Sequence, residues 1–217
     1  MKTFREFSRD SINRLVSKKF VDIFSANNKS DAIKKLEENF KVTVLGVGTF
    51  SVAFSELNSS QDYIVKIGEA WDPISRLYNG ALRWAQICKE RHSKFAGYPE
   101  VIDARRLKSG KDYIMIMEHL DYDEKKILNA LKIDEIVHAL PPKTFNNYRP
   151  LKGSAAFQTL IDCLEGKHKD LFFKYNPELK NVMTTAWSFN ILRMKDIHNG
   201  NVAVDKNGKF MMVDPWA

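Results

Sequence analysis

Residues 196–214 read DIHNGNVAVDKNGKFMMVD. Within this stretch, two short apolar runs at 202–204 and 210–213 flank the tetrapeptide Asp-Lys-Asn-Gly at 205–208, a composition typical of a tight turn. The pattern therefore predicts a β-hairpin. Such a hairpin returns Asp214 to the side of Asn201, so that one carboxylate and one amide oxygen can reach the same metal ion.

The spacing of three polar side chains in this stretch points to a chemistry. Asp196 lies five residues before Asn201, and Asp214 lies thirteen residues after it. Phosphoryl transfer needs one carboxylate to accept or orient the proton of the nucleophile, and it needs an amide oxygen and a second carboxylate to hold Mg²⁺ on the phosphates of ATP. The stretch therefore predicts an ATP- and Mg²⁺-dependent phosphotransferase.

A glycine-containing loop upstream supports the same prediction. Gly46 and Gly48 lie between two β-rich runs, and their lack of a Cβ lets backbone N–H groups approach phosphate oxygens. Lys66 lies inside the apolar run 63–67, where its charge needs a partner such as the α- and β-phosphates of a nucleotide. The alternative is a hairpin with two turn glycines and no ligand. The occurrence of both motifs, in this order, favours nucleotide binding.

Length and composition exclude several classes of protein. The chain has 217 residues, 44% of them hydrophobic, which is enough for one domain of two lobes with a full core. No apolar stretch approaches the roughly 20 residues that span a bilayer, and the first residues lack the apolar region of a signal peptide. Cys88 and Cys163 are too far apart to suggest a disulfide framework or a metal motif, and we expect them to be buried in a protein of a reducing cytosol.

The chain has a net charge of +7, and part of this positive charge lies in its first 20 residues. Basic residues crowd positions 1–20, while apolar residues recur there at roughly helical intervals, which predicts an amphipathic helix with a basic face. Two interpretations remain open: the solvated face of a docked helix, or a binding surface for an acidic partner. No RNA-binding signature or metal knuckle supports nucleic acid as that partner.

The order of predicted elements indicates an α+β protein. Helices are expected over 3–25, about 31–38, 73–92, 151–164 and 177–194, and strands within 42–67 and over 101–107 and 113–117. Ser30 or Asp31 is the expected cap of the second helix, and Asp72-Pro73 the expected start of the third. We expect an N-terminal helical extension at 1–40, a strand-rich lobe at 41–120 and a helical lobe at 121–217.

Taken together, the motifs resemble those of the protein-kinase superfamily. They are Leu45-Gly46-Val47-Gly48-Thr49-Phe50-Ser51, Ile64-Val65-Lys66, Met117-Glu118-His119-Leu120, and 196–201 with Asp214. More narrowly, residues 46–54, 64–68 and 196–201 with Asp214-Pro215 are similar to the early serine/threonine protein kinases of T7-like bacteriophages. The resemblance covers about residues 35–217. It implies a bilobal fold and a kinase that phosphorylates itself and host proteins, including the transcription and translation machinery, in the bacterial cytoplasm.

The resemblance also implies roles for residues of the first lobe. Gly46, Gly48 and Ser51 would cover the phosphates, with Ser51 standing where a third glycine is usual. Lys66 would bind the α- and β-phosphates. The segment Glu118 to Leu120 matches the hinge, whose backbone groups would hydrogen-bond adenine. The acidic partner of Lys66 is open between Glu90 and Asp72.

In the second lobe, Asp196 would be the catalytic base or substrate orienter, and Asn201 and Asp214 the Mg²⁺ ligands. The His-Arg pair that usually precedes the catalytic Asp is Met194-Lys195 here. His198 stands where protein kinases commonly have Lys, and as a hydrogen-bond donor it can stabilise the transferring phosphoryl group. Asp-x-His-x-Gly-Asn is also the pattern of aminoglycoside and choline kinases, so a small-molecule acceptor stays open.

The region after the second Asp departs further from the kinase pattern. Asp214-Pro215-Trp216 replaces Asp-Phe-Gly, and the sequence reaches only Ala217. If that end is native, we expect a reduced second lobe without an activation segment. A third hypothesis follows from this departure and from the basic N-terminal helix: a nucleotide-binding protein that inhibits a host factor by contact alone.

Overall fold

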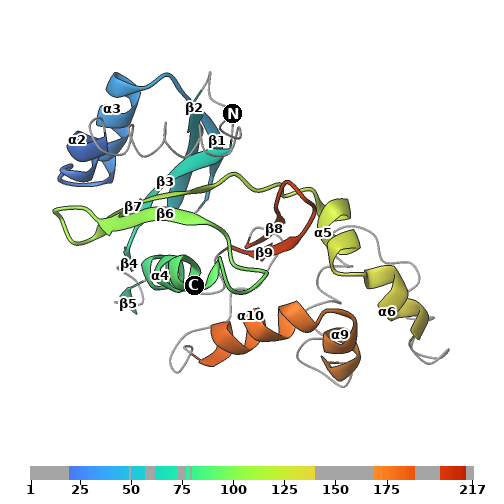
Figure 1. Ribbon diagram of the computed structural model, residues 1–217. Helices are drawn as coiled ribbons and strands as arrows, with labels where there is room; N and C mark the ends of the chain where they lie inside the picture. The colour runs from blue at the N-terminus through green and yellow to red at the C-terminus, as the bar shows by residue number, and fades with distance from the viewer. Residues whose placement is uncertain are drawn as a thin grey trace, which may run out of the picture. The chain divides into compact units, whose positions relative to one another are not determined.

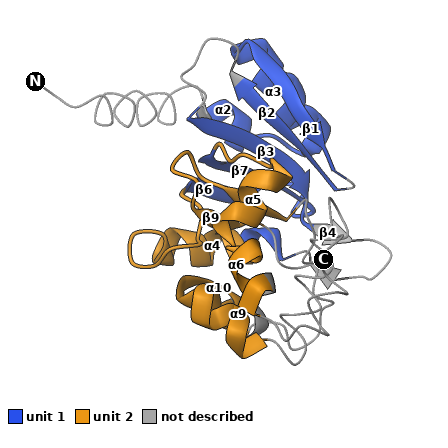
Figure 2. Ribbon diagram, turned by 90° about the vertical axis from the view of Figure 1, so that its right-hand side faces the viewer, with its two compact units in different colours: residues 1–82, 101–118 blue, residues 83–100, 119–217 orange. Residues whose placement is uncertain are grey.

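The computed structural model of the chain describes residues 20–48, 50–56, 62–72, 77–78, 80–139, 169–188 and 201–213 (Figure 1). The chain divides into two compact units (Figure 2). Unit 1 comprises residues 1–82 and 101–118, and unit 2 comprises residues 83–100 and 119–217. The predicted extension at 1–40 and lobes at 41–120 and 121–217 stay predictions.

The main feature of unit 1 is a five-stranded antiparallel sheet in the order β1-β2-β3-β7-β6 (Figure 1). Its strands are β1 (Val42–Val47), β2 (Ser51–Glu56), β3 (Tyr63–Glu69), β6 (Val101–Arg106) and β7 (Asp112–Glu118). β3 and β7 are interior strands rich in β-branched and aromatic residues, as a pleated, half-buried surface favours. The sheet, together with the helices of the chain, confirms the α+β class.

Two helices, α2 (Phe20–Phe24) and α3 (Lys29–Asn39), cover one face of this sheet. Ile23 of α2 and Leu36 of α3 are fully buried in a cluster with Phe54, Ile67 and Ile114, which come from β2, β3 and β7. Burying an aliphatic side chain of this size stabilises a fold by about 1.5–3 kcal/mol. The described part of the predicted N-terminal extension is therefore part of the core of unit 1.

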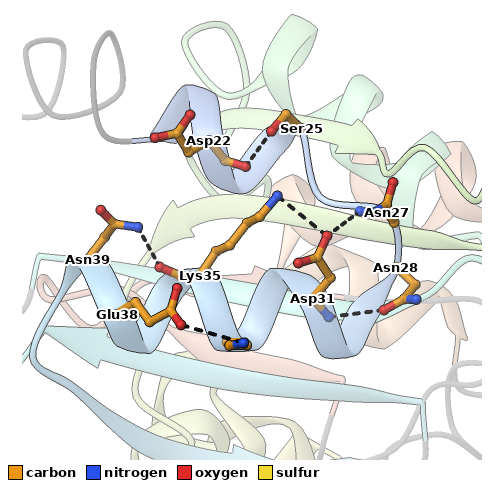
Figure 3. Close-up of polar contacts among 9 residues, drawn as sticks. Asp22, Ser25, Asn27, Asn28, Asp31, Lys35, Glu38 and Asn39 are labelled. Atoms are coloured by element: carbon orange, nitrogen blue, oxygen red, sulfur yellow. Dashed lines mark hydrogen bonds and ion pairs between the residues drawn. The ribbon is translucent and has the colours of Figure 1, made fainter.

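The turn between α2 and α3 corrects one detail of the prediction. Asn28 caps α3, because its side-chain oxygen accepts a hydrogen bond from Asp31 N at 3.0 Å (Figure 3). Ser30 and Asp31, the expected caps, lie inside the helix. Asp31 instead accepts a hydrogen bond from Asn27 N at 2.7 Å and pairs with Lys35. The Asn27 N–H, helped by Lys35, holds the pKa of Asp31 below its ordinary value.

The hairpin of β6 and β7 holds the start of α3 in place. Asp112 is only 8% exposed, and its carboxylate accepts hydrogen bonds from Lys29 N at 3.0 Å and from Ser109 Oγ at 3.1 Å. A carboxylate at the N-terminus of a helix satisfies an unpaired N–H and matches the helix dipole. Two backbone bonds, Lys108 N to Ala26 O and Ser109 N to Asn27 O, continue the same contact.

Residues 71–82 depart from the prediction of a long helix over 73–92. Trp71–Asp72 forms β4, which pairs with β5 (Leu77–Tyr78), and helix α4 begins only at Ala81 and ends at Arg91. Asp72 is therefore a strand residue and not a helix cap. In the register of this ribbon, Trp71 pairs with Tyr78 and Asp72 pairs with Leu77.

Unit 2 contains most of α4 and all the elements after the sheet. These are α5 (Glu124–Ala130), α6 (Ile133–Ala139), α9 (Lys169–Tyr175), α10 (Pro177–Ser188), β8 (Val202–Val204) and β9 (Phe210–Met212). α10 begins at Pro177 as predicted, because proline at the first helical position loses no hydrogen bond. The helices α5, α6 and α9 were not predicted. The expected helix over 151–164 lies outside the described residues.

Cys88 is buried in α4, as expected, and Cys163 lies outside the described residues. Among the helices that the structure describes, none has both the length and the apolar character that a membrane span requires.

Candidate functional site

The glycine-containing turn connects β1 and β2 at one end of the sheet. Gly48 N donates a hydrogen bond to Ser51 O at 2.8 Å, and Val47 pairs with Val52 across the two strands. Phe50 O accepts a hydrogen bond from Glu69 N at 2.8 Å, which ties the turn to the end of β3. The predicted hairpin around Gly46, Gly48 and Ser51 is thus present, and Thr49 lies outside the described residues.

The described residues do not by themselves require glycine at positions 46 and 48. A Cβ added to Gly46 would meet no atom within 4 Å, and one added to Gly48 would make only ordinary contacts of 3.6 Å with Ser51. Neither residue has the positive φ of Gly97, Gly110 and Gly208. The two glycines leave space along the backbone, and such space is useful where a ligand approaches N–H groups closely.

Lys66 lies at the middle of β3, on the sheet face opposite α2 and α3. Its neighbours along the strand, Val65 and Ile67, pack against the helices, and successive side chains of a strand point to opposite faces. Across the sheet, Lys66 pairs with Ala53 of β2 and with Met115 of β7. The side chain is half-buried.

Two residues after Lys66 along β3, the strands β2, β3 and β7 are closely packed around Gly68. Ser51 pairs with Gly68, and Gly68 pairs with Tyr113. A Cβ on Gly68 would lie 2.8 Å from the Tyr113 ring and 2.8 Å from Ser51 Cβ, so only glycine fits there. Gly68 therefore lets the buried Tyr113 ring pack across β3 beside the lysine. No motif in the sequence predicted this pair, although glycine inside a strand is a recognised sign of close approach.

The predicted hinge begins at the end of β7 and continues into unit 2. Glu118 is the last residue of β7 and the last residue of unit 1, and Leu120 is buried in unit 2. Met117, which the resemblance places before the hinge, is also buried and pairs with Ile64. Next in sequence, Asp121 exchanges two backbone hydrogen bonds of 2.9 Å with Val204 of β8.

The carboxylate of Asp121 forms an ion pair that depends on pH. It accepts hydrogen bonds from Lys126 Nζ at 2.5 Å and from Asp123 N at 2.8 Å. The Lys126 ammonium, followed by the Asp123 N–H, holds the pKa of Asp121 below its ordinary value. The same bond raises the pKa of Lys126.

Replacing Lys126 with Met is expected to raise the pKa of Asp121 toward the ordinary value. Because the pKa of Asp121 is lower in the folded chain, this pair stabilises the fold above the unfolded pKa and loses its effect as pH falls through the folded pKa. The variant should therefore melt slightly earlier than the wild type at about pH 7 and together with it at about pH 2. Carboxyl NMR titration and thermal melts measure both quantities. An unchanged pKa of Asp121 in the variant would contradict the assignment.

In unit 2, the hairpin predicted from residues 202–213 is confirmed. β8 and β9 pair antiparallel with Val202 opposite Met212 and Val204 opposite Phe210. Asp205 closes the turn by accepting hydrogen bonds from Asn207 N and Lys209 N, both at 2.8 Å, and Gly208 has a φ of +74°. Beyond the last pair, Val213 N donates to Asn201 O at 2.8 Å.

This last bond bears on the predicted metal ligands. It joins Asn201 to Val213, the residue immediately before Asp214 in the sequence. An amide oxygen and a carboxylate are hard oxygen ligands that suit Mg²⁺. Asp196, His198 and Asp214 themselves lie outside the described residues, so their predicted roles stay predictions. Among the described residues, no cluster of His, Cys, Asp or Glu forms an alternative metal site.

Glu90 and Asp72 were the two predicted acidic partners of Lys66. Glu90 is exposed near the end of α4 and accepts a hydrogen bond from Gln86 Nε2 at 2.8 Å. The side chain of Asp72, the other candidate, lies outside the described residues.

Comparison with known proteins gives similarity only at the level of solved structures. No protein-family model matches the chain, and no curated protein matches it. A thermostable mutant of aminoglycoside phosphotransferase APH(4)-Ia, in ternary complex with AMP-PNP and hygromycin B, aligns over 83% of this chain and 69% of its own, at 15% identity and a TM-score of 0.37. Aminoglycoside phosphotransferase APH(4)-Ia aligns over 85% and 70%, at 18% identity and a TM-score of 0.35. Similarity this low assigns neither a family nor a substrate.

Proposed function

We propose that this chain is an ATP-dependent phosphotransferase whose acceptor is a serine or threonine hydroxyl of a protein. The observation that supports it most is the position of Lys66. This lysine lies on the interior strand β3, on the sheet face away from α2 and α3. It pairs with Ala53, two residues after Ser51 of the glycine turn. A lysine ammonium at this position is a suitable donor for the phosphate oxygens of a bound nucleotide.

Each half of the chain then has a chemical task. In unit 1, the backbone N–H groups of the turn at 46–51 bind phosphate oxygens, and Lys66 orients the α- and β-phosphates of ATP. In unit 2, Asp196 accepts or orients the proton of the acceptor hydroxyl, and Asn201 and Asp214 hold the metal. Mg²⁺, when bound, neutralises charge on the β- and γ-phosphates. His198 donates a hydrogen bond to the transferring group.

The protein acceptor is the finer part of the proposal and rests on the resemblance to phage kinases, with host bacterial proteins as substrates. The second candidate is a small-molecule phosphotransferase. The motif 196–201, Asp-Ile-His-Asn-Gly-Asn, favours it, because aminoglycoside and choline kinases share this pattern. A third candidate, inhibition of a host protein by contact, requires nucleotide binding without transfer.

Transfer of label from γ-labelled ATP separates these candidates. The purified chain is incubated with Mg²⁺ and either a bacterial lysate or a panel of aminoglycosides and choline, and an excess of EDTA serves as control. Acid-stable, EDTA-sensitive label on the chain or on lysate proteins is expected. Label on a small molecule alone would favour the second candidate. Binding of ATP without any transfer would favour the third, and absence of ATP binding would reject the proposal.

A further inference from the structure

The β8–β9 hairpin is held at both of its edges by other parts of unit 2. On the β8 side, Asp121 and Val204 exchange two backbone hydrogen bonds. On the β9 side, Met212 N donates to Gly97 O at 2.9 Å, and Met212 O accepts a hydrogen bond from Trp84 Nε1 at 2.9 Å. The backbone of Met212, two residues before Asp214, is thus fixed by contacts from residues 84 and 97.

The bond from Trp84 joins groups that have no access to water. Trp84 is only 2% exposed, and its indole has a single N–H to donate. A buried indole N–H usually requires an acceptor, and here that acceptor is a main-chain carbonyl 128 residues later in the sequence. The bond therefore fixes the β9 backbone at one point.

The segment that comprises α4 and Tyr98 is itself joined to α10 by a partly buried polar network. Tyr98 OH lies 2.9 Å from Asn181 Oδ1 and 2.8 Å from Thr185 Oγ1, and Arg91 Nη1 donates to Thr185 Oγ1 at 3.1 Å. The Trp84 and Tyr98 rings pack with their centroids 5.6 Å apart. α4 and α10 are therefore joined inside unit 2 by contacts that are separate from the bond between Trp84 and β9.

We propose that Trp84 is a positioning residue for the metal-binding end of the hairpin. It fixes Met212, and the neighbouring Val213 N bonds to Asn201 O, so the two chain segments that carry Asn201 and Asp214 are held together before any metal arrives. The inference rests on the proposed function, which assigns the metal to these two residues. Groups that hydrogen-bond metal ligands directly change metal affinity by about 10–100-fold when they are removed. Trp84 acts one step further away, through the main chain of Met212, so the lower end of that range is expected.

The variant Trp84→Phe tests the role directly, since it keeps a buried ring and removes only the N–H donor. Binding of Mn²⁺ is measured by water-proton relaxation in the presence of a non-hydrolysable ATP analogue. The variant is expected to bind Mn²⁺ about tenfold more weakly. The Mg²⁺ concentration for half-maximal transfer should rise by a similar factor, while binding of the analogue without metal stays unchanged.

Tyr98→Phe is the matched control. It also removes one polar group from a buried aromatic ring of unit 2, but the lost hydrogen bonds lead to α10 and not to β9. It is expected to leave Mn²⁺ binding within about twofold of the wild type, a difference smaller than that caused by loss of an outer metal partner. Equal losses in both variants would mean that Trp84 acts only on general stability and would overturn the positioning role.

A measurement on the wild type covers the case in which Trp84→Phe does not fold. Bound Mn²⁺ should broaden the indole N–H resonance of Trp84 once the analogue is present, and an unbroadened resonance overturns the inference. A wild type that binds neither Mn²⁺ nor nucleotide rejects the proposed function and this inference with it. A wild type that binds both, alongside a Trp84→Phe variant of equal Mn²⁺ affinity, rejects the positioning role alone.

Discussion

Replacement of Lys66 by Met is expected to lower kcat/KM for ATP by roughly 10²–10³-fold, the cost of removing one preorganised charged donor from a phosphoryl-transfer site. Methionine keeps an unbranched apolar chain at position 66, between the paired residues Ala53 and Met115. The packing of the sheet should therefore be preserved. Stability should therefore change little while transfer is nearly lost. Steady-state kinetics with varied ATP, together with urea unfolding of both proteins, measure the two effects separately.

Lys34→Met provides the matched control for this prediction. Lys34 lies on α3 in the same unit, is largely exposed and pairs with Glu38 at 3.8 Å, so its removal costs at most about 0.5 kcal/mol of stability. Its kcat/KM should equal that of the wild type. If Lys66→Met kept more than a tenth of the wild-type value, Lys66 would not contact the phosphates and the proposed nucleotide site would lose its main support.

The features that the sequence predicted well have local causes. The turn at 205–208 needs a residue that accepts hydrogen bonds from following N–H groups and a residue that tolerates positive φ, and Asp205 and Gly208 supply these properties. The strands at 101–107 and 113–117 were recognisable because their β-forming residues are bounded by Ser109 and Gly110. Such patterns are contained within a few residues, so they can be read without knowledge of the fold.

The start of α4 was predicted wrongly because a local signal was overridden. Asp72-Pro73 has the composition of a helix N-terminus, yet the chain pairs Trp71 with Tyr78 and delays the helix to Ala81. A helix cap contributes only about 1 kcal/mol, so this local signal alone cannot decide between the start of a helix and a strand pairing.

The contacts that fix the β9 end of the hairpin could not be predicted from the sequence. Trp84 and Gly97 act on Met212 through contacts across more than 100 residues of chain. An apolar residue on a helix predicts burial, but it does not identify the carbonyl that its N–H will reach. The roles of Asp196, His198 and Asp214 stay predictions, because these residues lie outside the described part of the chain.

Substitution of Gly97 by Ala is expected to lower the free energy of unfolding by about 2–5 kcal/mol. Gly97 has a φ of +87°, and a Cβ there would lie 2.4 Å from Val182 Cγ2 of α10. A non-glycine residue with positive φ costs roughly 1–2 kcal/mol, and overpacking of a filled site adds about 1–3 kcal/mol. Urea unfolding followed by tryptophan fluorescence measures the loss.

Gly110→Ala separates the two contributions to this loss. Gly110 also has a positive φ, +71°, but a Cβ there would meet no atom within 4 Å, so this variant should lose only the backbone part, about 1–2 kcal/mol. The double variant Gly97→Ala with Val182→Ala should recover part of the larger loss, because the clashing methyl group is removed, and the coupling between the two sites should be at least about 1 kcal/mol. Equal losses at the two glycines, without coupling to Val182, would show that the loop around residue 97 moves away from α10. In that case the hydrogen bond from Met212 N to Gly97 O would be lost or lengthened in the variant.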